Sequence, residues 1–119
     1  MTHRADKFEI EVTGFLNAKG EPMVKLPAFA EDRETLVAMY TAMVRTRTFD
    51  TKANALQRTG RLGTYASSLG QEAIGVGVAS AMTGDDVFLP SFREHAAQLW
   101  RGVSLQELFL YWGGDERGN

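Results

Sequence analysis

Five consecutive residues in the second half of the chain carry side chains that could bind an anion and move a proton. Ser91-Phe92-Arg93-Glu94-His95 supplies a hydroxyl, an aromatic ring, a fixed cation, a carboxylate and an imidazole. An arginine can hold a phosphate through two parallel hydrogen bonds, and a histidine can carry a proton near neutral pH. The same residue types also occur in a surface Arg–Glu pair beside a solvated histidine, and taken alone they favour that second interpretation.

The residues around this cluster predict a strand that ends where a helix begins. Residues 87–89 are apolar and follow the polar Asp85-Asp86 turn, so they predict a short buried strand. Pro90 ends the strand, and a helix is predicted from Phe92 to Trp100. Free backbone N–H groups and the helix dipole favour anions at such a junction in α/β proteins. The Ser91–His95 cluster is therefore a candidate anion site.

Three further helices are predicted. Residues 30–58 carry acidic side chains at their start and apolar residues at three- and four-residue steps, which is typical of an amphipathic helix packed on a core. Residues 71–82 predict a helix buried on most sides. Within it, Gly75 and Gly77 predict the close approach of another backbone, because glycine costs up to about 1 kcal/mol relative to alanine inside a helix. Ser104 and Glu107 have capping-box spacing and start the last helix.

The remaining segments are a loop and an N-terminal arm. Residues 58–70 contain three glycines and are too long for a simple connection, so we expect contacts to hold this loop in place. Residues 8–12 alternate apolar and charged side chains, which indicates a half-exposed strand. A turn at residues 17–20 could return the chain so that residues 23–26 form a hairpin.

Composition excludes several classes of protein. The 119 residues contain no cysteine and carry a net charge of −2, so neither disulfides nor binding to nucleic acid or an anionic membrane is indicated. No apolar run approaches the roughly 20 residues of a membrane span, and the N-terminus lacks the features of a secretion or transit signal. We therefore expect a cytoplasmic protein.

Two local patterns do not carry the functions that they suggest at first. Gly75-Val76-Gly77 lacks the third glycine and the preceding strand of a dinucleotide loop, and Asp85-Asp86 is more typical of a solvated turn than of a metal site.

Several motifs, in one order along the chain, resemble a known family. They are LQRTGRLGTY (residues 56–65), GQEA (70–73), DDVFLPSFRE (85–94) and LWRG (99–102). Together they are similar to the N-terminal part of the alpha subunit of thiamine diphosphate-dependent 2-oxo acid dehydrogenases, of the pyruvate or branched-chain type. The resemblance implies an α/β fold. Residues 30–119 would be the truncated beginning of a parallel-sheet, diphosphate-binding domain that is mostly helical within this chain, and residues 1–29 an extended arm.

The resemblance also implies a reaction and partners. Such enzymes decarboxylate a 2-oxo acid and pass the acyl group to the lipoyl arm of an acyltransferase. A beta subunit completes the active site within a heterotetramer. The family's diphosphate-binding tyrosine–arginine pair falls on Phe92 and Arg93, and Ser91 falls on a position that also touches the cofactor in branched-chain members. His95 matches a catalytic histidine of some pyruvate-type members, and Thr64 and Tyr65 fall on the loop that lines the substrate pocket.

Three departures from the family pattern qualify these expectations. Phe92 lacks the phenolic hydroxyl that would donate to a phosphate, and Thr64 replaces the usual phenylalanine. The family's magnesium motif, a Gly-Asp-Gly followed by Asn-Asn, is absent; the nearest string is Gly114-Asp115-Glu116. We therefore expect a fragment without metal ligands that is inactive alone. The alternatives are a non-catalytic helical interaction module, retained as an assembly remnant, and a transketolase-like half subunit.

Overall fold

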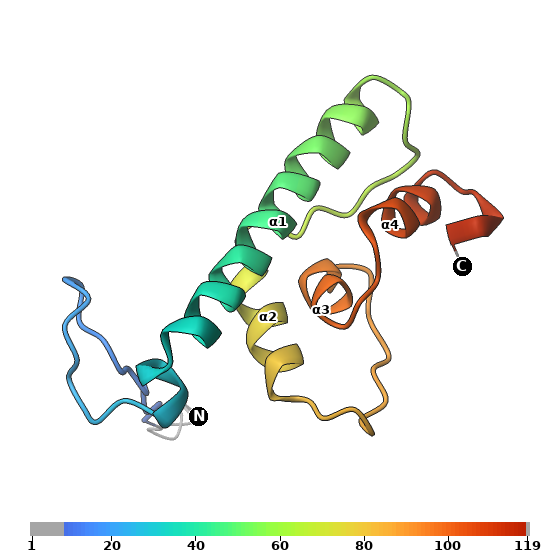
Figure 1. Ribbon diagram of the computed structural model, residues 1–119. Coiled ribbons are helices and arrows are strands. Elements are labelled where there is room, and N and C mark those ends of the chain that lie inside the picture. The colour runs from blue at the N-terminus through green and yellow to red at the C-terminus, as the bar shows by residue number, and fades with distance from the viewer. Residues whose placement is uncertain (1–8, 119) are drawn as a thin grey trace, which may run out of the picture.

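The computed structural model describes residues 9–118, and in this range the helices are the only regular elements apart from one isolated β-bridge (Figure 1). In chain order they are η1 (Ala28–Glu31), α1 (Arg33–Arg58), α2 (Glu72–Ala81), α3 (His95–Trp100), α4 (Leu105–Trp112) and η2 (Glu116–Gly118), where η denotes a 3-10 helix. Figure 1 shows α1 as the long axis of the molecule, with the loop that follows it running back beside it. No helix among the described residues is long and apolar enough to cross a membrane.

Side-chain caps set the starts of α1 and α4. Asp32 accepts a hydrogen bond from the Glu34 amide (3.0 Å) and one from the Thr35 hydroxyl (2.6 Å), so α1 begins at Arg33 rather than at residue 30. The capping box predicted for the last helix is confirmed. Ser104 Oγ accepts from the Glu107 amide (3.1 Å), and the Glu107 carboxylate accepts from the Ser104 amide (2.7 Å).

The hydrophobic core lies between the C-terminal half of α1, the loop that follows it, α3 and α4. Its buried members are Phe49, Ala53, Tyr65, Leu99 and Leu108. Partly buried apolar side chains surround them, namely Leu62, Val103, Leu105, Phe109 and Trp112. The ring of Phe49 lies 4.7 Å from that of Phe109, centroid to centroid, and 5.9 Å from that of Tyr65. These aromatic contacts join α1, α4 and the loop in a single core.

Helix α2 packs on α3 through one glycine. A Cβ added at Gly75 would lie 2.7 Å from the Cβ of Ala96 and 3.1 Å from the Ala97 amide nitrogen, so the predicted close approach is confirmed there. The same prediction is wrong for Gly77, where such a Cβ would meet no atom within 4 Å. Burial of α2 on most sides is also wrong for this chain, because Ile74 is 68% exposed and Val78 is 55% exposed.

The strand predicted for residues 87–89 is absent from the described chain. This segment is extended but has no ladder partner, and Leu89 is 86% exposed. A strand needs a neighbouring strand to bond its backbone groups, and the described residues contain none. The helix expected from Phe92 also begins later, at His95.

The N-terminal arm forms only one β-bridge of the expected hairpin. A single antiparallel bridge joins Leu16 and Pro22 around the predicted turn, where the Asn17 amide donates to the Glu21 carbonyl (2.9 Å). Residues 9–12 form no strand. The remainder of the expected strand, Phe8, and residues 1–7 lie outside the described range.

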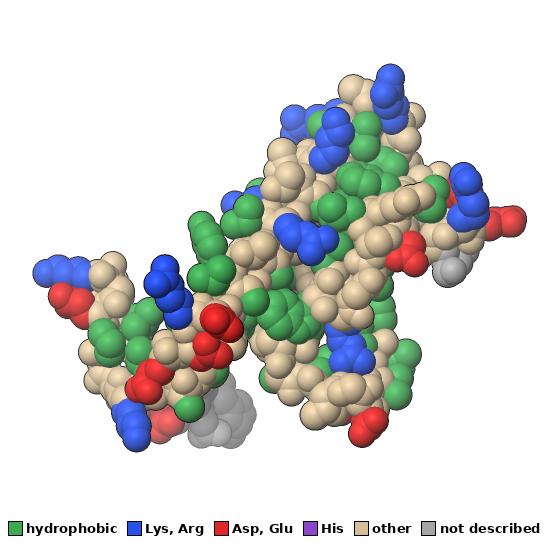
Figure 2. All heavy atoms as spheres, in the orientation of Figure 1, with side chains coloured by type: hydrophobic (Ala, Val, Ile, Leu, Met, Phe, Trp, Pro, Cys, Tyr) green, Lys and Arg blue, Asp and Glu red, His purple; other side chains and the backbone are tan. Residues whose placement is uncertain are grey.

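The chain is far from compact. Its radius of gyration is 18.7 Å, whereas about 13–14 Å is typical of a closed domain of this length. Apolar side chains are exposed along the N-terminal half of α1, on α2 and on the loop before α3, including Val37, Tyr40, Val44, Ile74, Val78, Val87 and Leu89. Figure 2 shows hydrophobic side chains at the surface along α1. Exposed apolar area on this scale is typical of a surface that another polypeptide segment covers.

Candidate functional site

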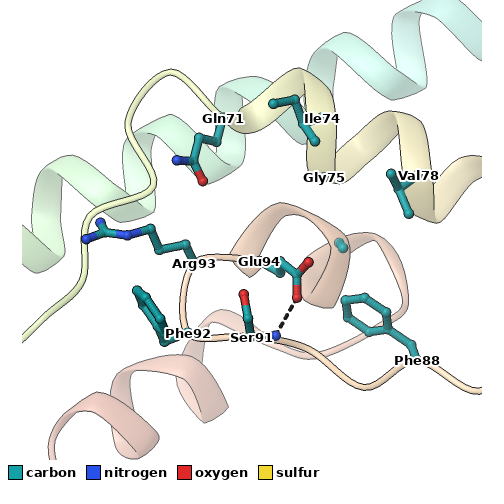
Figure 3. A pocket seen from close by; sticks show the side chains of 10 residues that line it. Gln71, Ile74, Gly75, Val78, Phe88, Ser91, Phe92, Arg93 and Glu94 are labelled. Carbon is teal, nitrogen blue, oxygen red and sulfur yellow. Dashed lines mark hydrogen bonds between the residues drawn. The ribbon is translucent and has the colours of Figure 1, made fainter. Parts of the chain in front are cut away.

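Four of the five residues of the predicted Ser91–His95 cluster line a cavity between α2 and the loop before α3, and His95 does not (Figure 3). The cavity has a volume of about 210 Å³. Its lining comes from Gln71, Ile74, Gly75, Val78, Phe88, Ser91, Phe92, Arg93, Glu94 and Ala97. One wall is therefore apolar and belongs to α2, and the opposite wall carries the charged and hydroxyl groups.

Arg93 is held at the rim of this cavity by two contacts. Its guanidinium donates a hydrogen bond to the carbonyl of Ser67, which belongs to the loop between α1 and α2. The guanidinium carbon also lies 5.2 Å from the centroid of the Phe92 ring, a cation–π geometry. Arginine has five N–H donors, so the bond to Ser67 leaves donors for a ligand. Phe92 is 61% exposed and orients Arg93 from its other side.

Ser91 and Glu94 form a turn beside Arg93. The Ser91 amide donates to the Glu94 carboxylate, which folds residues 91–94 back on themselves and delays the start of α3. With only six residues, α3 offers a weaker dipole to an anion than the predicted helix would have done. The Glu94 carboxylate also offsets the charge of Arg93 within the same cavity. The cavity thus combines one cation with a nearby carboxylate and is not a strongly positive pocket.

The loop before α3 is anchored by Arg101, a residue of the LWRG motif to which the sequence analysis assigned no role. The guanidinium of Arg101, just after α3, donates to the carbonyls of Thr83 and Asp86, each over 2.9 Å. The Asp86 carboxylate in turn accepts from the Thr83 amide (2.6 Å). Nothing in the local pattern around Arg101 signals this role, because its acceptors are backbone carbonyls distant in sequence.

His95 lies in the core and is 1% exposed. Its Nε2 accepts a hydrogen bond from the indole N–H of Trp112 (3.0 Å), a group that can only donate. Nε2 must therefore be unprotonated, so Nδ1 carries the proton and faces Ser68 Oγ at 3.1 Å. Burial lowers the pKa of His95, and Arg93 adds to this effect while Asp50 opposes it. The imidazole is neutral, fully bonded and enclosed by protein.

Asp50 is the second buried polar centre, and the sequence analysis missed it. This α1 carboxylate is 1% exposed and accepts four hydrogen bonds from four groups. Oδ1 accepts from the Tyr65 hydroxyl (2.7 Å) and the Ser68 amide (2.7 Å). Oδ2 accepts from the Ser67 hydroxyl (2.8 Å) and the Asn54 amide (3.0 Å). The sequence did contain a signal for it: Asp50 is an acidic residue at a position that shares one face of the helix with residues 46, 49 and 53.

The two residues expected to line a substrate pocket lie on different sides of the loop. Tyr65 points into the core, where its hydroxyl bonds Asp50 and its ring stacks on His95 at 5.4 Å. Burial and the bond to Asp50 raise the pKa of the Tyr65 phenol. Thr64 is exposed. Neither residue is part of the lining of the cavity at Arg93.

The start of α2 is tied to α1 by an ion pair. The Glu72 carboxylate accepts from Arg47 Nε (2.6 Å) and from Arg47 Nη2 (3.0 Å), and also from the Gly70 amide (3.2 Å). Arg47 lowers the pKa of Glu72 to about 2. Within residues 9–118 no group of three or more His, Asp or Glu side chains is placed to hold a metal ion.

Comparison with known proteins relates the chain to one family. The family described as "Dehydrogenase E1 component" matches residues 40–119. The chain is 46% identical over 104 residues to the pyruvate dehydrogenase E1 component subunit alpha of Acholeplasma laidlawii, which covers 87% of the chain and 28% of that protein. It is 37% identical over 106 residues to the Bacillus subtilis protein of the same name, again 87% of the chain and 28% of that protein.

A plant relative belongs to the branched-chain type. The chain is 35% identical over 103 residues to the 2-oxoisovalerate dehydrogenase subunit alpha 2, mitochondrial, of Arabidopsis thaliana, which covers 87% of the chain and 22% of that protein. No solved structure gives a significant match. The chain therefore spans about a quarter of the length of the curated relatives that it matches.

Proposed function

Because the chain belongs to the dehydrogenase E1 component family, we propose that it is the leading part of an alpha subunit of a 2-oxo acid dehydrogenase. Enzymes of this family generally use thiamine diphosphate. In the proposed reaction a 2-oxo acid loses carbon dioxide and its acyl group passes to the lipoyl group of an acyltransferase. Relatives named for pyruvate and for 2-oxoisovalerate support this class without choosing between the two substrates.

The observation that carries the proposal is the anchored guanidinium of Arg93 beside the cavity. It lies within the matched segment, and two neighbouring groups fix its direction. In the complete enzyme Arg93 binds the diphosphate of the cofactor through paired hydrogen bonds, and the Ser91 hydroxyl assists it. Phe92 contributes by packing alone, and the missing hydroxyl would cost about 1.5–3 kcal/mol of cofactor binding.

The described residues fit one end of the cofactor and leave the other end open. Glu94 offsets the charge of Arg93, and the described residues gather no group of three or more His, Asp or Glu side chains that could hold a metal ion. In this proposal a magnesium motif from further sequence therefore balances the diphosphate. When bound, thiamine diphosphate supplies the carbanion that attacks a 2-oxo acid. We expect the isolated chain to bind it weakly and to lack dehydrogenase activity.

His95 and Thr64 take different roles in this proposal. Enclosed by Trp112, Tyr65 and Ser68, His95 acts on the site by holding the loop of residues 64–68, and a direct role in proton transfer would require α4 to move. Thr64 is exposed and lines the substrate pocket together with the partner subunit.

The exposed apolar side chains indicate a surface that a partner covers, and two functions would provide one. In the first, the rest of the alpha subunit and a beta subunit cover them, within a cytoplasmic heterotetramer. In the second, the chain is a non-catalytic helical module that docks through the same surface. The coding sequence after Asn119 distinguishes the two: an in-frame Gly-Asp-Gly and Asn-Asn supports the enzyme, and a stop codon supports the module.

A kinetic experiment tests the enzyme function. The complete alpha subunit, assembled with its beta subunit, is assayed with pyruvate and with a branched-chain 2-oxo acid over a range of thiamine diphosphate concentrations. Arg93→Ala should raise the cofactor concentration needed for half-maximal rate, whereas Arg45→Ala, on the exposed side of α1, should not. An Arg93→Ala enzyme with an unchanged requirement for the cofactor would refute the assignment.

A further inference from the structure

We propose that Asp50 is a positioning residue for Arg93, acting through Ser67. This inference rests on the proposed function of Arg93 as a diphosphate ligand. It adds a buried carboxylate on α1 that touches neither the cavity nor its ligand. The route runs from the Asp50 carboxylate to the Ser67 hydroxyl, and from the Ser67 carbonyl to the Arg93 guanidinium.

Asp50 fixes the loop between α1 and α2 at three points. It binds the Tyr65 hydroxyl, the Ser67 hydroxyl and the Ser68 amide, over 2.7, 2.8 and 2.7 Å. These donors lie within four consecutive residues, so a single carboxylate defines the path of the backbone through Ser67. A buried carboxylate without its donors is costly, so the loop and Asp50 constrain each other.

This path of the backbone directs the Ser67 carbonyl toward Arg93. Arg93 is exposed and has a long side chain, which would otherwise sample several rotamers. The Ser67 carbonyl and the Phe92 ring restrict the guanidinium from two directions. Of these two, the carbonyl supplies the hydrogen bond, and its place depends on Asp50. A binding group held in advance loses less entropy when its ligand arrives.

A matched pair of substitutions isolates this route. Ser67→Ala and Asn54→Ala each remove one hydrogen bond to the same oxygen of Asp50, at 2.8 and 3.0 Å. Each also removes one longer bond, from the Leu69 amide to Ser67 Oγ (3.3 Å) and from the Asn54 side chain to the Asp50 carbonyl (3.1 Å). Only Ser67 belongs to the loop that holds Arg93; Asn54 lies one turn further along α1. Both variants should lose similar stability to heat. They should differ in cofactor affinity.

The experiment uses the complete enzyme, with thiamine diphosphate and magnesium titrated into each variant. Ser67→Ala should weaken the affinity about tenfold, and Asn54→Ala should leave it unchanged. Ser67→Thr, which keeps the hydroxyl, should restore it. At saturating cofactor the maximal rate of Ser67→Ala should equal that of the unmodified enzyme, because positioning affects binding of the diphosphate and not the later chemistry.

Combination with Arg93→Ala separates this inference from the proposed function. If Asp50 acts through Arg93, the double variant Ser67→Ala/Arg93→Ala should bind the cofactor no more weakly than Arg93→Ala alone. Additive losses, or equal losses in Ser67→Ala and Asn54→Ala, would overturn the positioning role and leave the function of Arg93 intact. An unchanged affinity in Arg93→Ala would instead overturn the proposed function, and this inference with it.

Discussion

The indole N–H of Trp112 on α4 donates a hydrogen bond over 3.0 Å to Nε2 of His95 at the start of α3. This bond fixes the tautomer of a buried imidazole, because the indole nitrogen can only donate. The proton of His95 consequently lies on Nδ1, toward Ser68. A second proton on Nε2 would direct an N–H against the indole N–H and break the link between α3 and α4.

The stability of the folded chain should therefore depend on His95 in mildly acidic solution. Burial lowers the pKa of His95 in the folded state from the ordinary 6.5. The unfolded chain binds a proton as the pH falls below about 6.5 while the folded chain does not, so the free energy of unfolding should decrease from pH 7 toward pH 5.5. Urea unfolding at a series of pH values measures this change.

Two variants serve as controls for the histidine effect. His95→Gln should be less stable at pH 7 but nearly independent of pH over this interval. His3→Asn removes the other histidine of the sequence and should keep the full pH dependence. An NMR titration in which the His95 ring protonates near pH 6.5 in the folded chain would contradict the account.

Trp112→Phe should destabilise the chain by about 1–3 kcal/mol, because it leaves the buried Nε2 of His95 without a donor. Thermal unfolding measures the loss. Trp100→Phe is the matched control: Trp100 is the only other tryptophan, is partly buried, and its indole N–H makes no hydrogen bond to any of the described residues. Equal losses in the two variants would show that the indole N–H contributes nothing beyond packing.

Two glycines of α2 should respond to alanine with opposite signs. Gly75→Ala should cost about 1–3 kcal/mol through overpacking, since the new Cβ would meet Ala96 at 2.7 Å. Gly77→Ala meets nothing within 4 Å and should stabilise the helix by up to about 1 kcal/mol. Denaturant midpoints of the two variants test the pair. Destabilisation by Gly77→Ala in this chain would mean that α2 packs on both sides.

The ion pair between Glu72 and Arg47 should stabilise the chain above pH 4.5 and progressively less below it. The folded pKa of Glu72 is lowered to about 2 from 4.5, so the unfolded chain binds a proton first as the pH falls through this window. Glu72→Gln should lose about 1–3 kcal/mol at pH 7 and show a shallower decline between pH 4.5 and 2. Glu34→Gln, exposed on the first turn of α1, is the control. A decline as steep in Glu72→Gln as in the unmodified chain would contradict this role.

The sequence predicted those features that depend on residues close to each other in the chain, such as helix starts and caps. The Ser104–Glu107 cap and the acidic start of the long helix lie within one helical turn of what they bond, and both are confirmed with small shifts of the boundary. Gly75 was predictable because a helix accepts glycine at a cost. Gly77 carried the same signal, but no backbone approaches it in this chain.

Features that depend on distant partners could not be predicted in the same way. Residues 87–89 have strand composition, yet no neighbouring strand exists among the described residues, so their pattern produced no sheet. Asp50 has the sequence context of any polar residue on an amphipathic helix, and its role became visible only when the loop folded back on it. The site residues remain predictions: the structure places Arg93 and Ser91 at the cavity and His95 in the core.

The central claim is that this chain supplies the Arg93 end of a diphosphate site whose metal end lies elsewhere. Calorimetric titration of thiamine diphosphate with magnesium, into the isolated chain and into the complete enzyme, tests it most directly. We predict magnesium-dependent binding by the complete enzyme, about 10–100-fold weaker in Arg93→Ala, and no such binding by the isolated chain. Tight, magnesium-dependent binding by the isolated chain, or an affinity unchanged by Arg93→Ala, would contradict it.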